Sequence, residues 1–161
     1  LAWLSQPDAG DILLDPFCGA GTILIERALM ARYRLLLGGD LDAEALGAAV
    51  ENIGPRHKPR QLLRWDAQHL PLEARSVNVV VTNLPFGVQI GDPALVRALY
   101  PAAVAEMERV LAPAGRLVLL TGEEEQLQSA LARHASLTVD KRHRLDLLGQ
   151  PASIVVAHKA R

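Results

Sequence analysis

The sequence is poor in cysteine, in aromatic residues and in long apolar stretches, and the first and last of these shortages exclude whole classes of protein. A single cysteine, Cys18, excludes an internal disulfide and fits a reducing compartment. No apolar run approaches the roughly 20 residues that a membrane-spanning helix needs, and no signal peptide is recognisable. We therefore expect a cytoplasmic protein without a membrane partner.

The chain also lacks an excess of positive charge. Its 17 lysine and arginine residues are balanced by 18 aspartate and glutamate residues, which gives a formal net charge of −1. A domain that binds nucleic acid unaided is usually more basic, because contacts to phosphate groups supply most of its non-specific affinity. If the substrate is a nucleic acid, we expect much of its binding to come from residues outside this chain.

In other respects the amino-acid composition is that of an ordinary globular domain. Of the 161 residues, 50% are hydrophobic and 22% are charged, which suits one domain (residues 1–161) with a substantial core. Because the chain begins with Leu1 and not with methionine, we expect it to be part of a longer protein. The five histidines show no metal-ligand spacing with the cysteine, so no metal site is expected.

The most informative segment is Asp11–Glu26, which reads DILLDPFCGAGTILIE. A short apolar run ends in Asp15-Pro16, two glycines follow with one residue between them, and apolar residues then resume at helical spacing. This pattern predicts a strand, a glycine turn and a helix. Gly19 and Gly21 would let the backbone approach a ligand at the N-terminus of that helix. A plain tight turn gives the same pattern, so the turn alone leaves both interpretations open.

Predicted strands and helices alternate along the rest of the chain. The last two predicted strands, residues 137–147 and 153–158, are joined by the short segment 148–151, which suits an antiparallel hairpin. We therefore predict an α/β fold with a doubly wound, mostly parallel seven-stranded sheet. Helices should cover both faces of this sheet, and the C-terminal antiparallel hairpin should close it.

Polar residues stand at the ends of four predicted strands, namely Asp15, Asp40, Asp66 and Asn83. The carboxyl ends of parallel strands share one edge of the sheet, where ligands bind in such folds, so we expect these residues to line one site. The Asp40 carboxylate could accept hydrogen bonds from both hydroxyls of a ribose. It could instead cap the next helix, although Asp42 is the better candidate for that cap.

Three motifs give the chain a family resemblance. DPFCGAGT at residues 15–22, GGDLD at 38–42 and TNLPFG at 82–87 together resemble S-adenosylmethionine-dependent methyltransferases that modify exocyclic amino groups of nucleic-acid bases. Within that group the chain is most similar to the THUMP-associated tRNA guanine-N2 methyltransferase family, from about Asp11 to the C-terminus. The resemblance implies a Rossmann-like class I methyltransferase fold with S-adenosylmethionine as the cofactor.

The resemblance also implies roles for the residues at the predicted edge. Asp15 would hold the methionine end of the cofactor, and Gly19 and Gly21 would pass beneath it. Asp66 would accept a hydrogen bond from the adenine amino group, and Ala67 would offer its backbone amide. The other residues implied to contact the cofactor are Phe17, Thr22, Asp40, Leu41 and Asn83. A buried aspartate that stabilises the turn is the rival interpretation for Asp15, and a solvated loop aspartate is the rival for Asp66.

The segment Asn83-Leu84-Pro85-Phe86 is the implied catalytic element. An exocyclic amine is a poor nucleophile because its lone pair is delocalised into the ring. The side-chain oxygen of Asn83 and the backbone carbonyl of Leu84 could each accept one amine hydrogen and so direct the lone pair at the methyl group. Pro85 would fix the backbone, and Phe86 would offer a face to the target base. The alternative is a turn after a buried strand, with Phe86 in the core.

The predicted activity is methyl transfer to an exocyclic amino nitrogen of a base, with guanine N2 in tRNA favoured and the nucleotide flipped out of its stack. Guanine N2 in rRNA and adenine N6 in DNA or RNA are alternatives with the same chemistry. A non-catalytic cofactor-binding subunit would be expected to lose the Asn-Leu-Pro-Phe motif, and a nicotinamide-dependent oxidoreductase would need a G-x-G-x-x-G fingerprint that this sequence lacks. We expect the RNA to be docked by an N-terminal module absent from this chain.

Overall fold

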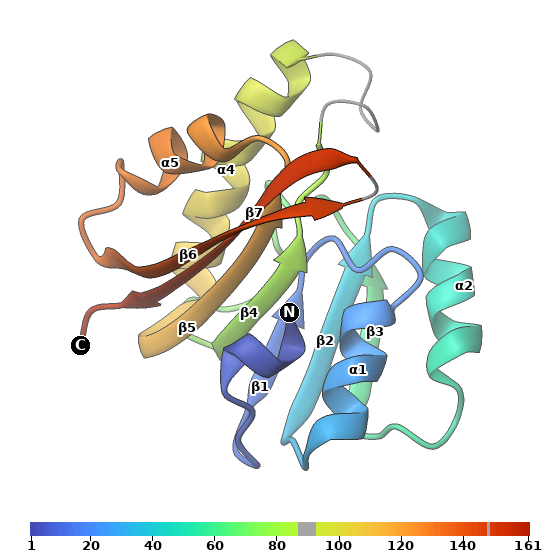
Figure 1. Ribbon diagram of the computed structural model, residues 1–161. Coiled ribbons are helices and arrows are strands. Elements are labelled where there is room, and N and C mark those ends of the chain that lie inside the picture. Colours follow the sequence, from blue (N-terminus) through green and yellow to red (C-terminus); the bar gives the residue numbers. More distant parts are fainter. Residues whose placement is uncertain (87–92, 148) are drawn as a thin grey trace.

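A computed structural model describes residues 1–86, 93–147 and 149–161 of the chain. These residues form a seven-stranded sheet with the strand order β3-β2-β1-β4-β5-β7-β6 (Figure 1). The strands are β1 (Ile12–Asp15), β2 (Leu35–Asp40), β3 (Arg60–Arg64), β4 (Val77–Asn83), β5 (Leu111–Thr121), β6 (Leu137–Leu147) and β7 (Gln150–Lys159). The helices are the 3₁₀ helix η1 (Ala2–Ser5) and the α-helices α1 (Thr22–Met30), α2 (Ala43–Ile53), α4 (Pro93–Val110) and α5 (Glu124–Leu131).

The direction of the strands confirms the predicted α/β sheet. Strands β1 to β5 pair in parallel, and β7 pairs antiparallel with both β5 and β6. The connection between β6 and β7 is shorter than the predicted segment 148–151, because β7 already begins at Gln150. Gly149 has a φ of +82°, the left-handed conformation that tight hairpin turns require. Leu148 and Gly87, which the sequence patterns include, lie outside the described residues.

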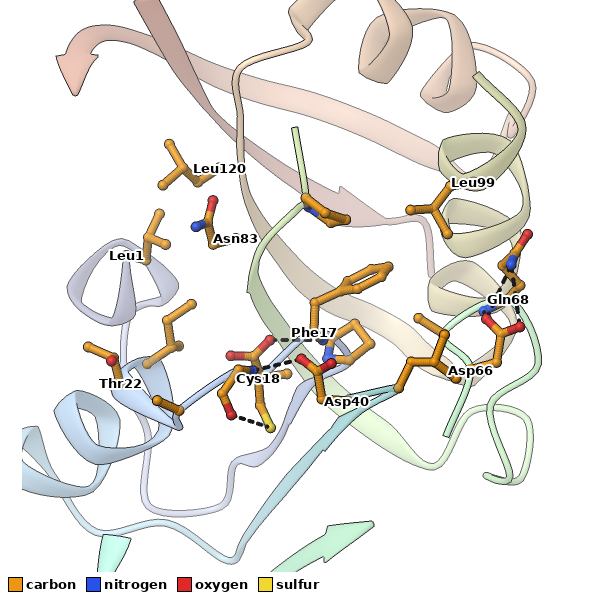
Figure 2. A pocket seen from close by; sticks show the side chains of 18 residues that line it. Leu1, Phe17, Cys18, Thr22, Asp40, Asp66, Gln68, Asn83, Leu99 and Leu120 are labelled. Atoms are coloured by element: carbon orange, nitrogen blue, oxygen red, sulfur yellow. Dashed lines mark hydrogen bonds between the residues drawn. The ribbon is translucent and has the colours of Figure 1, made fainter. Parts of the chain in front are cut away.

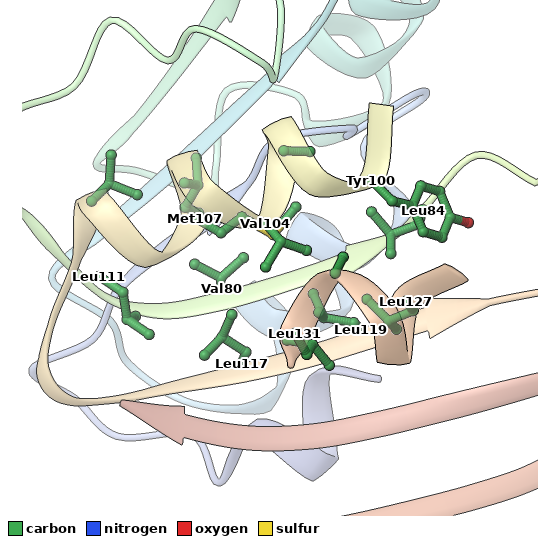
Figure 3. Close-up of a cluster of buried hydrophobic side chains, with 14 of the residues drawn as sticks. Val80, Leu84, Tyr100, Val104, Met107, Leu111, Leu117, Leu119, Leu127 and Leu131 are labelled. Atoms are coloured by element: carbon green, nitrogen blue, oxygen red, sulfur yellow. The ribbon is translucent and has the colours of Figure 1, made fainter. Parts of the chain in front are cut away.

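Helices cover both faces of the sheet, and neighbouring residues of each central strand alternate between the two faces. Leu14 and Val80 face a core cluster that α4 and α5 complete (Figure 3). Leu13 and Val79 face the opposite cluster, to which α1 and α2 contribute. Both positions of each pair are fully buried. This burial on both faces explains why the central strands are apolar at almost every residue.

Helix α1 is shorter than the sequence pattern predicts, since the apolar stripe of Leu24, Ala28 and Ala31 indicates a helix from about Gly21 to Tyr33. The helix ends at Met30, and its inner face includes the fully buried Arg27. The Arg27 guanidinium donates hydrogen bonds to the carbonyls of Ala31 (3.0 Å) and Arg32 (3.1 Å), and it pairs with Asp11 at 3.0 Å. These bonds satisfy carbonyls at the C-terminal end of the helix and so fix where it stops.

Candidate functional site

A cavity of about 690 Å³ opens beside the carboxyl ends of the central strands (Figure 2). Its walls include Asp15 at the end of β1, Asp40 at the end of β2 and Asn83 at the end of β4. Asp66, just after β3, also lines it. In Figure 2, Asn83 and Asp66 lie toward opposite ends of the cavity with Phe17 between them. The structure thus brings the four strand-end residues to one elongated site.

Asp15 has a fully buried carboxyl group at this cavity. Its Oδ1 atom accepts hydrogen bonds from the Thr82 hydroxyl (2.6 Å) and from the Phe17 amide (3.3 Å), so it stabilises the turn after β1. Its Oδ2 atom is buried and has no hydrogen-bond partner among the described residues. Desolvation by burial raises the pKa of Asp15 from 3.8 to about 7. The free oxygen is suited to a cationic hydrogen-bond donor, such as an ammonium group, that enters the cavity.

Asp40 braces the glycine turn and does not cap a helix. Its Oδ2 atom accepts a hydrogen bond from the Gly19 amide (2.9 Å), and its Oδ1 atom accepts one from the Asp42 amide (3.0 Å). Asp42 is the N-cap of α2, since its side chain accepts from the amides of Glu44 and Ala45. Each oxygen of Asp40 keeps a second lone pair, so the carboxylate can still accept hydrogen bonds from a ligand's hydroxyl groups.

The loop that carries Asp66 is fixed to helix α4. Glu106 of α4 accepts a hydrogen bond from the Leu70 amide (2.7 Å). Arg109 donates to the carbonyls of Leu70 (2.9 Å) and Leu72 (2.8 Å). The Asp66 carboxylate accepts from the Gln68 amide at 2.9 Å, which leaves part of its acceptor capacity for the cavity.

Asn83 provides a second buried oxygen without a partner. Its Oδ1 atom has no hydrogen-bond donor within reach in the described structure, although Asn83 lines the cavity. Leaving a buried polar atom unsatisfied costs about 1–3 kcal/mol. Natural proteins seldom keep such an atom unless a ligand, an ion or a water satisfies it. The Asn83 oxygen is therefore a candidate acceptor for a hydrogen of a molecule bound in the cavity.

Comparisons with known proteins agree with this geometry. A family model described as the RMKL-like methyltransferase domain matches residues 1–147. The chain belongs to this family. It is 36% identical over 143 residues to tRNA (guanine(6)-N(2))-methyltransferase THUMP3 of Bos taurus, which covers 80% of this chain and 28% of that relative. It is 35% identical over 127 residues to U6 snRNA (guanine-N(2))-methyltransferase THUMPD2 of Bos taurus, which covers 77% of this chain and 24% of that relative.

A solved structure supports the same assignment at the level of the fold. The crystal structure of TrmN from Thermus thermophilus matches with a TM-score of 0.82 and 30% identity, covering 98% of this chain and 46% of TrmN. The chain thus spans 28% and 24% of the length of the two curated relatives above. It is a methyltransferase domain of the class I fold.

The methyltransferase domain uses S-adenosylmethionine as its methyl donor, and the residues at the cavity fit this cofactor. Asp15 would offer a carboxylate oxygen to the amino group of the methionine part. Asp40 would offer acceptors to the ribose hydroxyls, and Asp66 would offer an acceptor to the adenine beside the buried Ala67. Gly19, at φ +50°, has no atom within 4 Å of where a Cβ would stand, so the turn presents bare backbone.

The structure places the remaining predicted residues of the methyltransferase domain in two groups. Phe17, Gly19, Thr22, Leu41, Ala67 and Pro85 line the cavity, whereas Gly21, Leu84 and Phe86 are not among its lining residues. Gly21 has a φ of +83°, and a Cβ there would lie 3.2 Å from Ala49 and from Ile53. Its lack of a side chain therefore allows α1 to approach α2. Leu84 is fully buried in the core.

Several other lining residues of the methyltransferase domain were not predicted to contact a ligand, including Gln68, Leu99 and Cys18, although Cys18 belongs to the predicted glycine turn. Gln68 follows Asp66 closely, so its position beside that loop could have been read from the sequence. Leu99 comes from α4, and only the packing of that helix brings it to the cavity. Cys18 is buried, and desolvation raises the pKa of its thiol to about 12, which removes it as a nucleophile.

The described residues contain neither a membrane-spanning helix nor a cluster of metal ligands. None of the helices there is long and apolar enough to cross a membrane. No group of three or more histidine, cysteine, aspartate or glutamate side chains in the same residues could hold a metal ion.

Proposed function

We propose that this domain transfers a methyl group from S-adenosylmethionine to the exocyclic N2 nitrogen of a guanine in tRNA. The observation that carries the proposal is the buried, unpartnered oxygen of Asn83 on the wall of the cavity that Asp15 and Asp40 also line. An amine hydrogen is the donor that this oxygen lacks. The choice of guanine N2 is supported by the names of both curated relatives, and the choice of tRNA by the name of THUMP3.

The Asn83–Phe86 segment would supply the positioning for the reaction. When bound, S-adenosylmethionine supplies an electrophilic methyl group on its sulfonium sulfur. The Asn83 side chain and the Leu84 carbonyl each accept one amine hydrogen, which moves the nitrogen toward tetrahedral geometry and frees its lone pair. The lone pair would take up this methyl group, and the electrons of the former bond would stay with the sulfur. The nitrogen then loses one proton to solvent, so no strong general base is needed.

Asp15 would orient the cofactor from the end of β1, the strand that pairs with the strand of Asn83. Its free Oδ2 atom accepts from the ammonium group of the methionine part, while Thr82 holds its Oδ1 atom in place. A carboxylate held from one side cannot rotate to follow a displaced ligand. Asp15 would thereby help to position the methyl group relative to Asn83, and such positioning can accelerate transfer without a strong base.

We further propose that residues beyond this chain bind most of the RNA, in a docking module that precedes the domain. The net charge of −1 supports this division, because phosphate binding needs many basic residues. The relatives support it as well, since the match covers 28% of THUMP3 and 24% of THUMPD2. The lone, buried cysteine supports a reducing, cytoplasmic location.

The test is a transfer assay with labelled S-adenosylmethionine and the full-length protein that contains this domain. Unmodified tRNA, U6 snRNA, rRNA and DNA are offered together, and each labelled nucleic acid is digested to identify its methylated nucleoside. We expect N2-methylguanosine from tRNA. N2-methylguanosine from U6 snRNA alone would replace the substrate and keep the chemistry. N6-methyladenine would contradict the guanine assignment, and no label in any substrate would contradict the proposed activity.

A further inference from the structure

Tyr100 of α4 is fully buried in the same core cluster as Leu84, and Figure 3 shows the two residues at one end of that cluster. Its hydroxyl nevertheless reaches the Asn83–Phe86 segment. It donates a hydrogen bond to the Pro85 carbonyl at 3.1 Å, and it lies 2.8 Å from the Thr121 hydroxyl. The Thr121 hydroxyl accepts in turn from the Glu123 amide at 2.8 Å. These bonds link β5 and α4 to the proposed catalytic segment.

The three hydrogen bonds can run in only one direction. An amide can only donate and a carbonyl can only accept, so the two ends of the series are fixed. The Glu123 amide donates to Thr121, the Thr121 hydroxyl donates to Tyr100, and the Tyr100 hydroxyl donates to the Pro85 carbonyl. Each hydroxyl thus uses its single hydrogen. A buried series with every member satisfied holds its geometry more firmly than isolated bonds do.

The residues on either side of Pro85 contact the end of β5 and the residue that follows this strand. The Leu84 amide donates to the Leu120 carbonyl at 2.9 Å. The Phe86 ring lies against Gly122, where a Cβ would stand 3.1 Å from the ring. Pro85 is the residue between them. Its pyrrolidine ring fixes φ but provides no amide hydrogen for the sheet. The Tyr100 hydroxyl supplies the hydrogen bond that restrains its other dihedral, ψ.

We propose that Tyr100 is a positioning residue for methyl transfer, acting through the Pro85 carbonyl. With φ of Pro85 fixed by its ring and ψ fixed by Tyr100, the Leu84 carbonyl and the Phe86 ring keep one relative orientation. Those are the two groups of this segment that the proposed function assigns to the target base, beside the cavity and not among its lining residues. This inference rests on the proposed function, because it assigns Tyr100 a part in the same reaction.

The variant Tyr100→Phe removes the hydroxyl and keeps the ring that fills the core. In the full-length protein we expect kcat to fall roughly tenfold, with the Kd for S-adenosylmethionine little changed, because Tyr100 does not line the cavity. Thr121→Val should lower kcat by a similar factor, whereas Thr121→Ser should keep it near the wild-type value. Because the residues act in series, the double variant Tyr100→Phe with Thr121→Val should be little worse than either single variant.

Ser5→Ala is the matched control, since Ser5 is also a fully buried hydroxyl, and its hydrogen bond goes to the Ala2 carbonyl and not to the segment. Its kcat should stay unchanged. A kcat of Tyr100→Phe equal to that of the wild type, or a loss equal to that of Ser5→Ala, would overturn the proposal. If the wild type methylates an amine other than guanine N2, the comparison is made on that substrate, and only the proposed function fails.

A second measurement does not depend on activity. We expect the amide of Leu84 to exchange its hydrogen about fivefold faster in Tyr100→Phe than in the wild type, because a neighbouring restraint is lost. Exchange at the buried strand β1 should not change. An unchanged rate at Leu84 would overturn the inference even if no methylated product were found with any substrate.

Discussion

Asp15 is the residue whose chemistry depends most on its surroundings, because burial moves its pKa from 3.8 to about 7. An ammonium group binds the ionised carboxylate, so below pH 7 the cofactor must displace a proton from Asp15 when it binds. We predict that the affinity for S-adenosylmethionine is about fivefold lower at pH 6 than at pH 7. Titration calorimetry at the two values checks this, and equal affinities would contradict it.

The variant Asp15→Asn separates that effect from other causes. The side chain keeps its size and an acceptor for Thr82, but it no longer titrates. Its affinity for S-adenosylmethionine should be weaker than that of the wild type at pH 7 and nearly the same at pH 6 and pH 7. A variant that retains the wild-type pH dependence would assign the proton to another group.

Asn83 is expected to act on the transfer step and hardly at all on cofactor binding. We predict that Asn83→Ala lowers kcat by on the order of 100-fold, because an acceptor aimed at the reacting group is lost. The Kd for S-adenosylmethionine should stay within about twofold. The matched control is Asn78→Ala on the same strand, since the Asn78 side chain bonds the Ile12 amide and is not among the cavity-lining residues. Transfer activity that survives Asn83→Ala would remove Asn83 from the mechanism.

At the level of single residues, the sequence predicted cavity-lining positions where a polar residue ended an apolar run. Asp15, Asp40, Asp66 and Asn83 could be placed together because parallel strands end at a common edge. Tyr100 could not be found in this way. It occupies an apolar position of a helix, and the partners of its hydroxyl lie 15 and 21 residues away along the chain. Only the packing of α4 against the sheet joins them.

Among the elements, α4 stabilises the cavity through the loop that follows β3. Glu106 and Arg109 hold the backbone of Leu70 and Leu72, close behind Asp66. We predict that Glu106→Ala weakens S-adenosylmethionine binding roughly fivefold and lowers the free energy of unfolding by about 1–2 kcal/mol. Calorimetry and urea denaturation measure the two quantities.

The control for this prediction is Glu108, which lies on the same helix but contacts other elements. Glu108 pairs with His134 and Ser136, and neither contact touches the cavity. Glu108→Ala should therefore cost a similar amount of stability and leave cofactor affinity unchanged. Equal losses of affinity in both variants would show that the effect of Glu106 is general destabilisation.

The sequence predicted the hairpin of β6 and β7 but could not tell which of its strands joins the sheet. Either strand could have paired with β5. The structure pairs β7 with β5, and β7 buries Ser153, Val155 and Ala157. Strand β6 exposes Lys141 and Arg142 at the edge. The choice follows from burial, since the strand with fewer charges occupies the inner position, and charged residues on an edge strand discourage further pairing.

For the molecule as a whole, the site is a source of instability that depends on pH. The pKa of Asp15 is higher in the folded protein than in the unfolded chain. The contribution of Asp15 to the free energy of unfolding is therefore most favourable below pH 4 and is lost as the pH rises toward 7. We predict that between pH 4 and pH 8 the wild type loses roughly 4 kcal/mol of unfolding free energy relative to Asp15→Asn. Urea denaturation of both proteins without cofactor tests this, and parallel pH profiles would contradict it.

The free oxygens of Asp15 and Asn83 line one cavity, and this arrangement has a consequence for inhibitor design. A single compound could carry an amino-acid head group for the first oxygen and an aminopurine for the second. Joining the two parts turns the second contact into an intramolecular event, so the compound should bind far more tightly than either part alone. Its selectivity would come from the distance between the two oxygens, because other enzymes that bind S-adenosylmethionine need not have the same distance.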